Sequence, residues 1–241
     1  MDHQLKQLQD WISESRHIVF FGGAGVSTES GIPDFRSVDG LYHQQYAFPP
    51  ETILSHSFFE RNPEEFYRFY RSKMLFPQAR PNAAHWKLAE LEAAGKLTAV
   101  VTQNIDGLHQ AAGRKPDYER HGSVHRNHCM KCRRFYGLDF LLETGGVPHC
   151  PACGGVVKPD VVLYEECLDE TTMEGAVEAI AGADMLIIGG TSLAVYPAAG
   201  LIRYYRGNRL ALINRSATPY DREAGLVINA SLGEVLGAIR V

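Results

Sequence analysis

Two closely spaced cysteine pairs constrain the fold of this chain more than any other feature of its sequence. Cys129 and Cys132 form the first pair, Cys150 and Cys153 form the second, and residues 133–149 separate them. Four thiolates in two C-x-x-C pairs suit Zn²⁺, whose ligands are soft and tetrahedrally arranged. Because four cysteines leave no open coordination position, we expect one structural Zn²⁺ that stabilises a small module at residues 121–159.

A glycine-rich turn near the N-terminus indicates a phosphate-binding site. Residues 17–21 have the pattern of a short buried strand that runs into Gly22–Ser27, and residues 27–30 are expected to open a helix. Backbone N–H groups of such a turn face the pyrophosphate of a dinucleotide. The loop reads Gly23-x-Gly25-x-x-Thr28, with Thr where the dinucleotide fingerprint has a third glycine. The G-x-G match alone is therefore a weak signal.

The other apolar segments predict an α/β fold with a doubly wound parallel sheet. Strands are expected at residues 97–102, 185–188, 210–213 and 226–228, and an amphipathic helix at 4–15. Strands that alternate with helices favour a parallel sheet. We expect a Rossmann-like domain at residues 1–40, 81–120 and 160–241, a helical insertion at 41–80 with helices near 50–60 and 63–75, and the zinc module at 121–159.

Composition argues against several classes of protein. The chain has 241 residues and a net charge of −4 with interspersed signs, which argues against a nucleic-acid binder. No apolar run approaches the roughly 18 residues of a membrane span, and the N-terminus lacks a signal-peptide pattern. Five cysteines with C-x-x-C spacing favour a metal over disulfides, and therefore a reducing compartment. We expect a cytoplasmic protein with no membrane partner and no specific nucleic-acid partner.

Polar or glycine clusters follow four of the predicted strands. They are Gly22–Ser27, Gln103–Asp106, Gly189–Ser192 and Asn214–Arg215. Any one of them could be an ordinary turn, but the carboxyl ends of parallel strands meet at one edge of the sheet, where ligands bind. Four clusters in register therefore predict a ligand site at that edge.

The sequence resembles the sirtuins, the NAD-dependent protein lysine deacylases. The resemblance rests on the string GAGVSTESGIPDFR at residues 23–36, on QNID at 103–106, on HGS at 121–123 and on the two cysteine pairs. It extends from about residue 17 to the C-terminus. It implies a deacetylase that converts acetyl-lysine and NAD into lysine, nicotinamide and O-acetyl-ADP-ribose. The implied co-substrate is NAD, and the implied substrates are acyl-lysine proteins or peptides.

The resemblance also implies roles for individual residues. His121 would be the general base, because an imidazole with a pKa near 6.5 is largely neutral at cytoplasmic pH. Asn104 would order a water or hydroxyl at the reacting ribose carbon, and Phe35 would exclude water from it. NAD is expected to contact Ala24, Gly25, Thr28, Phe35, Arg36, Gln103, Asn104, Ile105, Asp106, Thr191, Ser192, Asn214 and Leu232. The substrate peptide is expected along Val161, Val162, Tyr164 and Val195.

Two departures from the family pattern bear on substrate choice. The peptide-binding strand often reads Val-Val-x-Phe-Gly-Glu in the family, whereas residues 161–166 read VVLYEE here. Main-chain pairing with a peptide should survive, and we expect the extra carboxylate of Glu165 to favour basic residues beside the target lysine. Some members bind acidic acyl groups with a Tyr-x-x-Arg pair, but neither Tyr67-x-x-Tyr70 nor Tyr70-x-x-Lys73 matches it. Neutral acyl groups, mainly acetyl, are therefore expected.

Other functions use the same features differently. Mono-ADP-ribosyl transfer or NAD hydrolysis would use the same pocket with another nucleophile. An NAD-sensing binding module would be favoured by loss of His121 or Asn104, but both residues are present. The acidic balance also disfavours a zinc-ribbon nucleic-acid binder. By resemblance, the chain is expected to be a monomer.

Overall fold

A six-stranded parallel sheet forms the body of the computed structural model, which describes residues 2–35, 40–41, 46–114, 118–193 and 198–241. The strand order is β3-β2-β1-β7-β8-β9, and every neighbouring pair is parallel. The strands are β1 (Ile18–Gly22), β2 (Leu97–Thr102), β3 (Tyr118–Glu119), β7 (Met185–Gly189), β8 (Leu210–Ile213) and β9 (Leu226–Ile228). This order changes direction beside β1, as in a doubly wound sheet, so the predicted fold class is confirmed. The two-residue edge strand β3 was not predicted.

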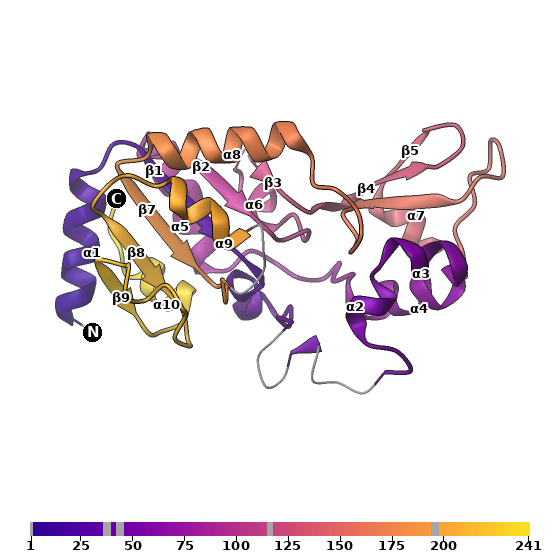
Figure 1. Ribbon diagram of the computed structural model, residues 1–241, viewed down its shortest axis with the longest axis horizontal. Helices are drawn as coiled ribbons and strands as arrows, with labels where there is room; N and C mark the ends of the chain where they lie inside the picture. Colours follow the sequence, from indigo (N-terminus) through magenta and orange to yellow (C-terminus); the bar gives the residue numbers. More distant parts are fainter. Residues whose placement is uncertain (1, 36–39, 42–45, 115–117, 194–197) are drawn as a thin grey trace.

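Helices cover both faces of this sheet, and alternation along β1 decides which residues face which layer. Ile18 and Phe20 belong to a core shared with α1 (Asp2–Glu14), α5 (Ala83–Ala93) and α10 (Leu232–Gly237). Val19 and Phe21 belong to the opposite core, shared with α8 (Glu170–Gly182) and α9 (Ala198–Leu201). Successive strand residues point to opposite faces, so an uninterrupted apolar run is required where both faces are covered. Figure 1 shows α8 lying along one side of the sheet.

The longest of the described helices are short. Both α1 and α8 have 13 residues. No helix in the described part of the chain combines the length and the apolar character needed to cross a membrane.

The prediction of a helix directly after the glycine turn is wrong. The chain instead makes two successive 3₁₀ turns, η1 (Ala24–Val26) and η2 (Thr28–Ser30). Gly31 ends the second turn in the left-handed region at φ 83°, and Pro33 follows without an N–H group to continue a helix. The side-chain amide of Asn82 donates to the Val26 carbonyl at 2.8 Å and to Ser30 Oγ at 3.0 Å. This contact from the start of α5 holds the turns in place.

The other part of the molecule contains a three-stranded antiparallel ribbon and a helical insertion. The ribbon has the order β5-β4-β6, with β4 (Gly122–Cys129), β5 (Phe135–Tyr136) and β6 (Val157–Val161), and α7 (Leu138–Glu143) beside it. The insertion comprises α2 (Pro50–Ile53), α3 (His56–Arg61) and α4 (Pro63–Lys73). The short α6 (Leu108–Ala111) follows β2 in the sheet part of the chain.

The helical insertion and the ribbon share one hydrophobic core. Phe59, Phe66 and Tyr67 from the helices pack with Leu141 and Val157 from the ribbon region. The Tyr67 hydroxyl also donates a hydrogen bond to the Val157 carbonyl. Figure 1 shows this body at the end of the molecule opposite both termini.

Candidate functional site

A cleft of about 1360 Å³ lies where the carboxyl ends of β1, β2, β7 and β8 meet the ribbon and the helical insertion. Every predicted NAD or peptide residue that the structure describes lines this cleft. These residues are Ala24, Gly25, Thr28, Phe35, Gln103, Asn104, Ile105, Asp106, His121, Val161, Val162, Tyr164, Thr191, Ser192, Asn214 and Leu232. Two further predicted residues, Arg36 and Val195, lie outside the described residues.

Glycines bring the turns after β1 and β7 into direct contact. The Gly25 amide donates to the Gly190 carbonyl at 2.8 Å. A Cβ atom on Gly25 would lie 2.7 Å from the Gly190 Cα atom, and Gly190 itself has φ 61°. Only residues without side chains allow two backbones to approach this closely. The cleft is therefore bounded here by bare backbone, the kind of surface that a pyrophosphate requires.

Three polar side chains from two strand ends form a hydrogen-bonded group in the cleft. Ser27 Oγ donates to Asp106 Oδ2 at 2.6 Å and accepts from the Asn104 side-chain amide at 3.1 Å. The Leu108 amide at the start of α6 donates to the other Asp106 oxygen at 2.9 Å. Burial raises the pKa of the Asp106 carboxyl, whereas the hydrogen bonds from Ser27 and Leu108 act in the opposite direction. Asn104 and Asp106 are thus fixed in orientation before any ligand arrives.

The sequence analysis included Ser27 in the Gly22–Ser27 cluster but predicted no role for its side chain. It also did not assign His125, whose Nε2 atom lies 3.0 Å from the Asp106 carbonyl oxygen. A hydroxyl between two glycine-flanked turns was the available signal for Ser27. For His125, no local pattern pointed to the site.

His121 is held in a form suited to accepting a proton. Its Nδ1 atom lies 3.0 Å from the Gln103 carbonyl oxygen, which can only accept a hydrogen bond. Burial and the nearby Arg120 guanidinium lower the pKa of His121 to about 4, and the Gln103 contact only partly opposes them. The imidazole is therefore neutral at physiological pH, with the lone pair on Nε2. This is a larger neutral fraction than the ordinary pKa near 6.5 implies.

A chain of hydrogen-bonded polar groups lies at the other end of the cleft. The Gln103 side-chain amide donates to Thr191 Oγ1 at 3.2 Å, and the Thr191 amide donates to Asn214 Oδ1 at 3.0 Å. The Asn214 Nδ2 group is buried and has no acceptor among the described residues. A buried donor without an acceptor is costly, so a ligand oxygen at this position would satisfy it.

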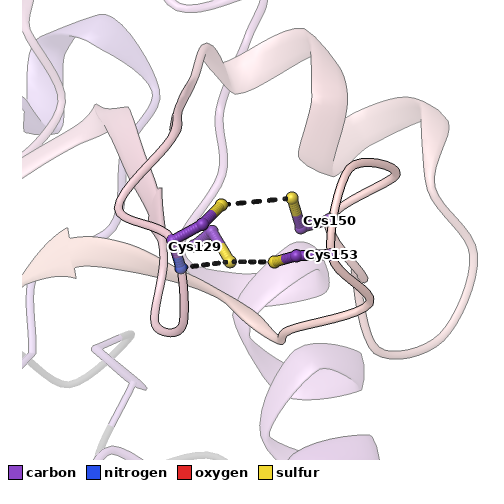
Figure 2. Close-up of side chains that lie close together, drawn as sticks. Cys129, Cys150 and Cys153 are labelled. Carbon is purple, nitrogen blue, oxygen red and sulfur yellow. Dashed lines mark hydrogen bonds between the residues drawn. The ribbon is translucent and has the colours of Figure 1, made fainter.

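The four cysteines of the ribbon form a cluster with the dimensions of a zinc site. All four Sγ atoms lie within 4.8 Å of one another. Cys129 Sγ lies 3.4 Å from Cys153 Sγ, and Cys132 Sγ lies 3.7 Å from Cys150 Sγ. A tetrahedral ion with Zn–S bonds of about 2.3 Å places its sulfurs about 3.8 Å apart. Figure 2 shows the sulfur atoms of Cys129, Cys150 and Cys153 facing one another, so the residues fit the metal.

The surroundings of the cluster agree with a structural metal. The Tyr136 hydroxyl lies 2.9 Å from Cys150 Sγ, and this hydrogen bond is the main cause that lowers the pKa of the Cys150 thiol. None of the four cysteines lines the cleft. A closed four-thiolate zinc site that lies away from the cleft would hold the ribbon together and would not activate water.

The sequence matches a family model and proteins of that family over most of its length. The model of the Sir2 family matches residues 23–197. An NAD-dependent protein deacetylase of Clostridium perfringens is 60% identical over 99% of both chains. The NAD-dependent protein deacetylase of Cutibacterium acnes is 56% identical and covers 98% of this chain and 97% of its own.

Solved structures show the same similarity in three dimensions. A Sir2 protein with a deacetylated p53 peptide and 3′-O-acetyl-ADP-ribose has a TM-score of 0.88 and 39% identity, covering 96% of this chain and 95% of its own. A complex of Sir2 with p53 peptide and NAD⁺ has a TM-score of 0.84 and 40% identity over the same shares. Because the family model spans most of the chain and the relatives match almost all of it, the chain belongs to the Sir2 family.

Proposed function

We propose that this protein is an NAD-dependent protein lysine deacetylase. The observation that carries the proposal is that His121, Asn104 and Asp106 line the same cleft as the expected peptide edge, Val161–Tyr164. The proposed base and the expected peptide edge therefore line one cleft. The identity of 60% to a protein named as an NAD-dependent protein deacetylase, over almost the whole chain, supports the same conclusion.

Each residue of the site has a chemical task in this reaction. NAD, when bound, would supply the ribose carbon that the acyl oxygen attacks, the hydroxyl that finally carries the acyl group, and the nicotinamide that leaves. The Nε2 atom of His121 accepts a proton from a ribose hydroxyl, because Nδ1 is hydrogen-bonded to the Gln103 carbonyl oxygen. Asn104 orients a hydroxyl or water, and Asp106 accepts from the nicotinamide carboxamide. Phe35 lines the cleft and excludes water from the reacting centre.

The remaining contacts serve to bind NAD. The turn at Ala24, Gly25 and Thr28 would face the pyrophosphate, with Arg36 as its charge partner. The adenosine end would contact Thr191, Ser192, Asn214 and Leu232, while Gln103 and Ile105 would line the middle of the site. The Asn214 amide that has no acceptor among the described residues supports the adenosine assignment.

We propose that the preferred acyl group is neutral, mainly acetyl. The Tyr67 hydroxyl donates to the Val157 carbonyl, and the Tyr70 side chain is fully buried. Neither tyrosine lines the cleft, so neither offers a hydroxyl to an acyl carboxylate. The peptide itself would lie along Val161, Val162 and Tyr164, and Val195 would be a further contact.

We also propose a cellular location, an oligomeric state and a division into domains. A four-thiolate zinc site requires reduced cysteines, which favours the cytoplasm. A net charge of −4 favours a protein that does not bind nucleic acid specifically, and we propose a monomer. We also propose the division into a Rossmann-like domain, a helical insertion and a zinc module at the boundaries given above.

Mass spectrometry of an acetyl-lysine peptide, incubated with the protein with and without NAD, tests the proposed function. We expect NAD-dependent loss of acetyl together with O-acetyl-ADP-ribose, abolished in His121→Ala. His17→Ala is the matched control, because His17 is exposed and lies before the opposite end of β1. Consumption of NAD with the peptide still acetylated would instead indicate ADP-ribosyl transfer or NAD hydrolysis. Binding of NAD without any turnover would indicate a sensing module.

A further inference from the structure

The segment after β6 contains a residue in an unfavourable backbone conformation. Glu165 has φ 75°, in the left-handed region that favours glycine. It directly follows Tyr164, at the end of the expected peptide edge, where the family pattern often has glycine. A non-glycine residue persists in such a conformation when its surroundings hold it there.

The Glu165 carboxylate makes the contacts that hold it. Oε2 accepts from the Ser57 amide at 2.9 Å, and Oε1 accepts from the Ser57 hydroxyl at 3.1 Å. Ser57 is the second residue of α3, where N–H groups have no partner within the helix and the helix dipole favours negative charge. These hydrogen bonds lower the pKa of the Glu165 carboxyl, as expected for a charged acceptor.

Main-chain hydrogen bonds join the same two segments. The Tyr164 amide donates to the Leu54 carbonyl at 3.0 Å, and the His56 amide donates to the Tyr164 carbonyl at 2.9 Å. Beside them, the His56 ring lies 2.9 Å from Glu166 Oε1. The loop after the peptide edge is thus attached to the junction of α2 and α3. Tyr164 and Glu165 together form a wall between the large cleft and a smaller cavity of about 350 Å³.

We propose that Glu165 is a positioning residue that ties the peptide-binding edge at residues 161–164 to helix α3 and thereby sets the affinity for acyl-lysine peptides. The proposal rests on the proposed deacetylase function. A peptide binds more tightly to an edge that is already ordered, because less conformational freedom is lost on binding. Both carboxylate oxygens accept from Ser57, and the preference for basic neighbours expected from the sequence stays a separate prediction.

Three variants separate the contact from the backbone strain. Glu165→Gly removes the carboxylate and suits the left-handed conformation, Glu165→Gln keeps one acceptor, and Ser57→Ala removes the hydroxyl. We expect Glu165→Gly to weaken binding of a fluorescent acetyl-lysine peptide about fivefold to tenfold, as for lost hydrogen bonds to a charged group. The KM for peptide should rise by the same factor, while kcat and the KM for NAD stay within about twofold.

A double variant and a control variant test whether the effect comes from the contact between Glu165 and Ser57. Glu165→Gln should lose roughly threefold or less, and adding Ser57→Ala to Glu165→Gly should cause little further loss, because the pair is one interaction. Glu51→Gln removes a charge from the lining of the smaller cavity and leaves the Ser57 contact intact, so its peptide affinity should equal that of the wild type.

Hydrogen exchange of residues 161–166 in the absence of peptide provides a readout that does not depend on function. Exchange should be faster in Glu165→Gly than in the wild type and unchanged in Glu51→Gln. Equal peptide affinity in Glu165→Gly and the wild type would overturn the proposal, and so would a fall in kcat at unchanged KM. If the wild type neither binds nor deacetylates the peptide, the proposed function fails, and the exchange measurement still decides whether the tether exists.

Discussion

The Nδ1 atom of His121 lies 3.0 Å from the carbonyl oxygen of Gln103, and this contact determines which ring nitrogen is free. The proton stays on Nδ1, so Nε2 is the atom able to accept one. The Gln103 side chain also donates to Thr191 at the end of β7. Gln103 therefore orients the proposed base, His121, and connects it to the adjacent turn of the cleft.

The pH dependence of catalysis should reflect the lowered pKa of His121. A general base must be neutral, and burial lowers this pKa to about 4. We expect kcat/KM to be constant on the acid side from about pH 8 down to pH 5 and to fall tenfold per pH unit well below pH 4. Initial rates measured in buffers of constant ionic strength test this. An acid limb centred near pH 6.5 would contradict the environment described here.

Stability should decrease as the pH falls from 6.5 toward 4. Burial lowers the pKa of His85 to about 4 and of His109 to about 3, and His121 joins them at about 4. The unfolded chain, with histidine pKa values near 6.5, binds up to three more protons in this window, so the loss approaches about 4 kcal/mol per pH unit near pH 5. Asp106, with a raised pKa, offsets at most one proton.

Urea unfolding at pH 7, 6 and 5 measures this linkage. His121→Asn should reduce the slope by about 1.4 kcal/mol per pH unit, because one imidazole with a lowered pKa is removed. A stability that does not change between pH 7 and 5 would be inconsistent with three histidines whose pKa values are lowered in the folded state.

Ser27→Ala should impair catalysis without unfolding the protein. It removes the donor to Asp106 at 2.6 Å and the acceptor for Asn104 at 3.1 Å. We expect kcat/KM to fall roughly 30-fold to 100-fold, which corresponds to about 2–3 kcal/mol for hydrogen bonds that involve a charged group. Steady-state kinetics with Ser13→Ala, an exposed serine of α1, as the control tests this. A loss below threefold would show that Ser27 does not orient these groups.

Gly25→Ala should weaken NAD binding. The added methyl group would lie 2.7 Å from Gly190 Cα, and the two backbones would have to separate, at a cost of about 1–3 kcal/mol. Calorimetric titration should show an NAD dissociation constant raised about tenfold or more, with a lower melting temperature. Gly182→Ala at the end of α8 is the matched control, because a Cβ atom there meets nothing within 4 Å. Unchanged NAD affinity in Gly25→Ala would exclude a close-approach role.

Tyr136→Phe should loosen the zinc site. The variant removes the hydroxyl that lies 2.9 Å from Cys150 Sγ, and outer hydrogen bonds of this kind change metal affinity by about 10-fold to 100-fold. Zinc transfer to a chromogenic chelator should therefore be faster than in the wild type, whereas Tyr204→Phe at an exposed site should match it. Complete chelation should unfold the ribbon first, seen as faster hydrogen exchange at residues 122–161. Equal release rates in both variants would count against the contact.

Several features of this protein follow from its sequence because they depend on local patterns. Fully buried parallel strands require continuous apolar runs, so the strands near residues 18, 97, 185, 210 and 226 were predictable. The carboxyl ends of such strands meet at one edge, which brought the predicted polar clusters into one cleft. The paired cysteines likewise predicted a tetrahedral cluster, because ligand type and spacing carry that information.

Only the tertiary structure decided the features that depend on contacts between distant segments. Ser27 and Asp106 are 79 positions apart, and Ser57 and Glu165 are 108 apart. The 3₁₀ turns after β1 depend on Asn82, and the lowered pKa of His121 depends on burial by the whole fold. A sequence pattern indicates which positions along one helix or strand are buried. It does not report which groups meet across elements, because hydrogen bonds and desolvation are set by the packing of the complete chain.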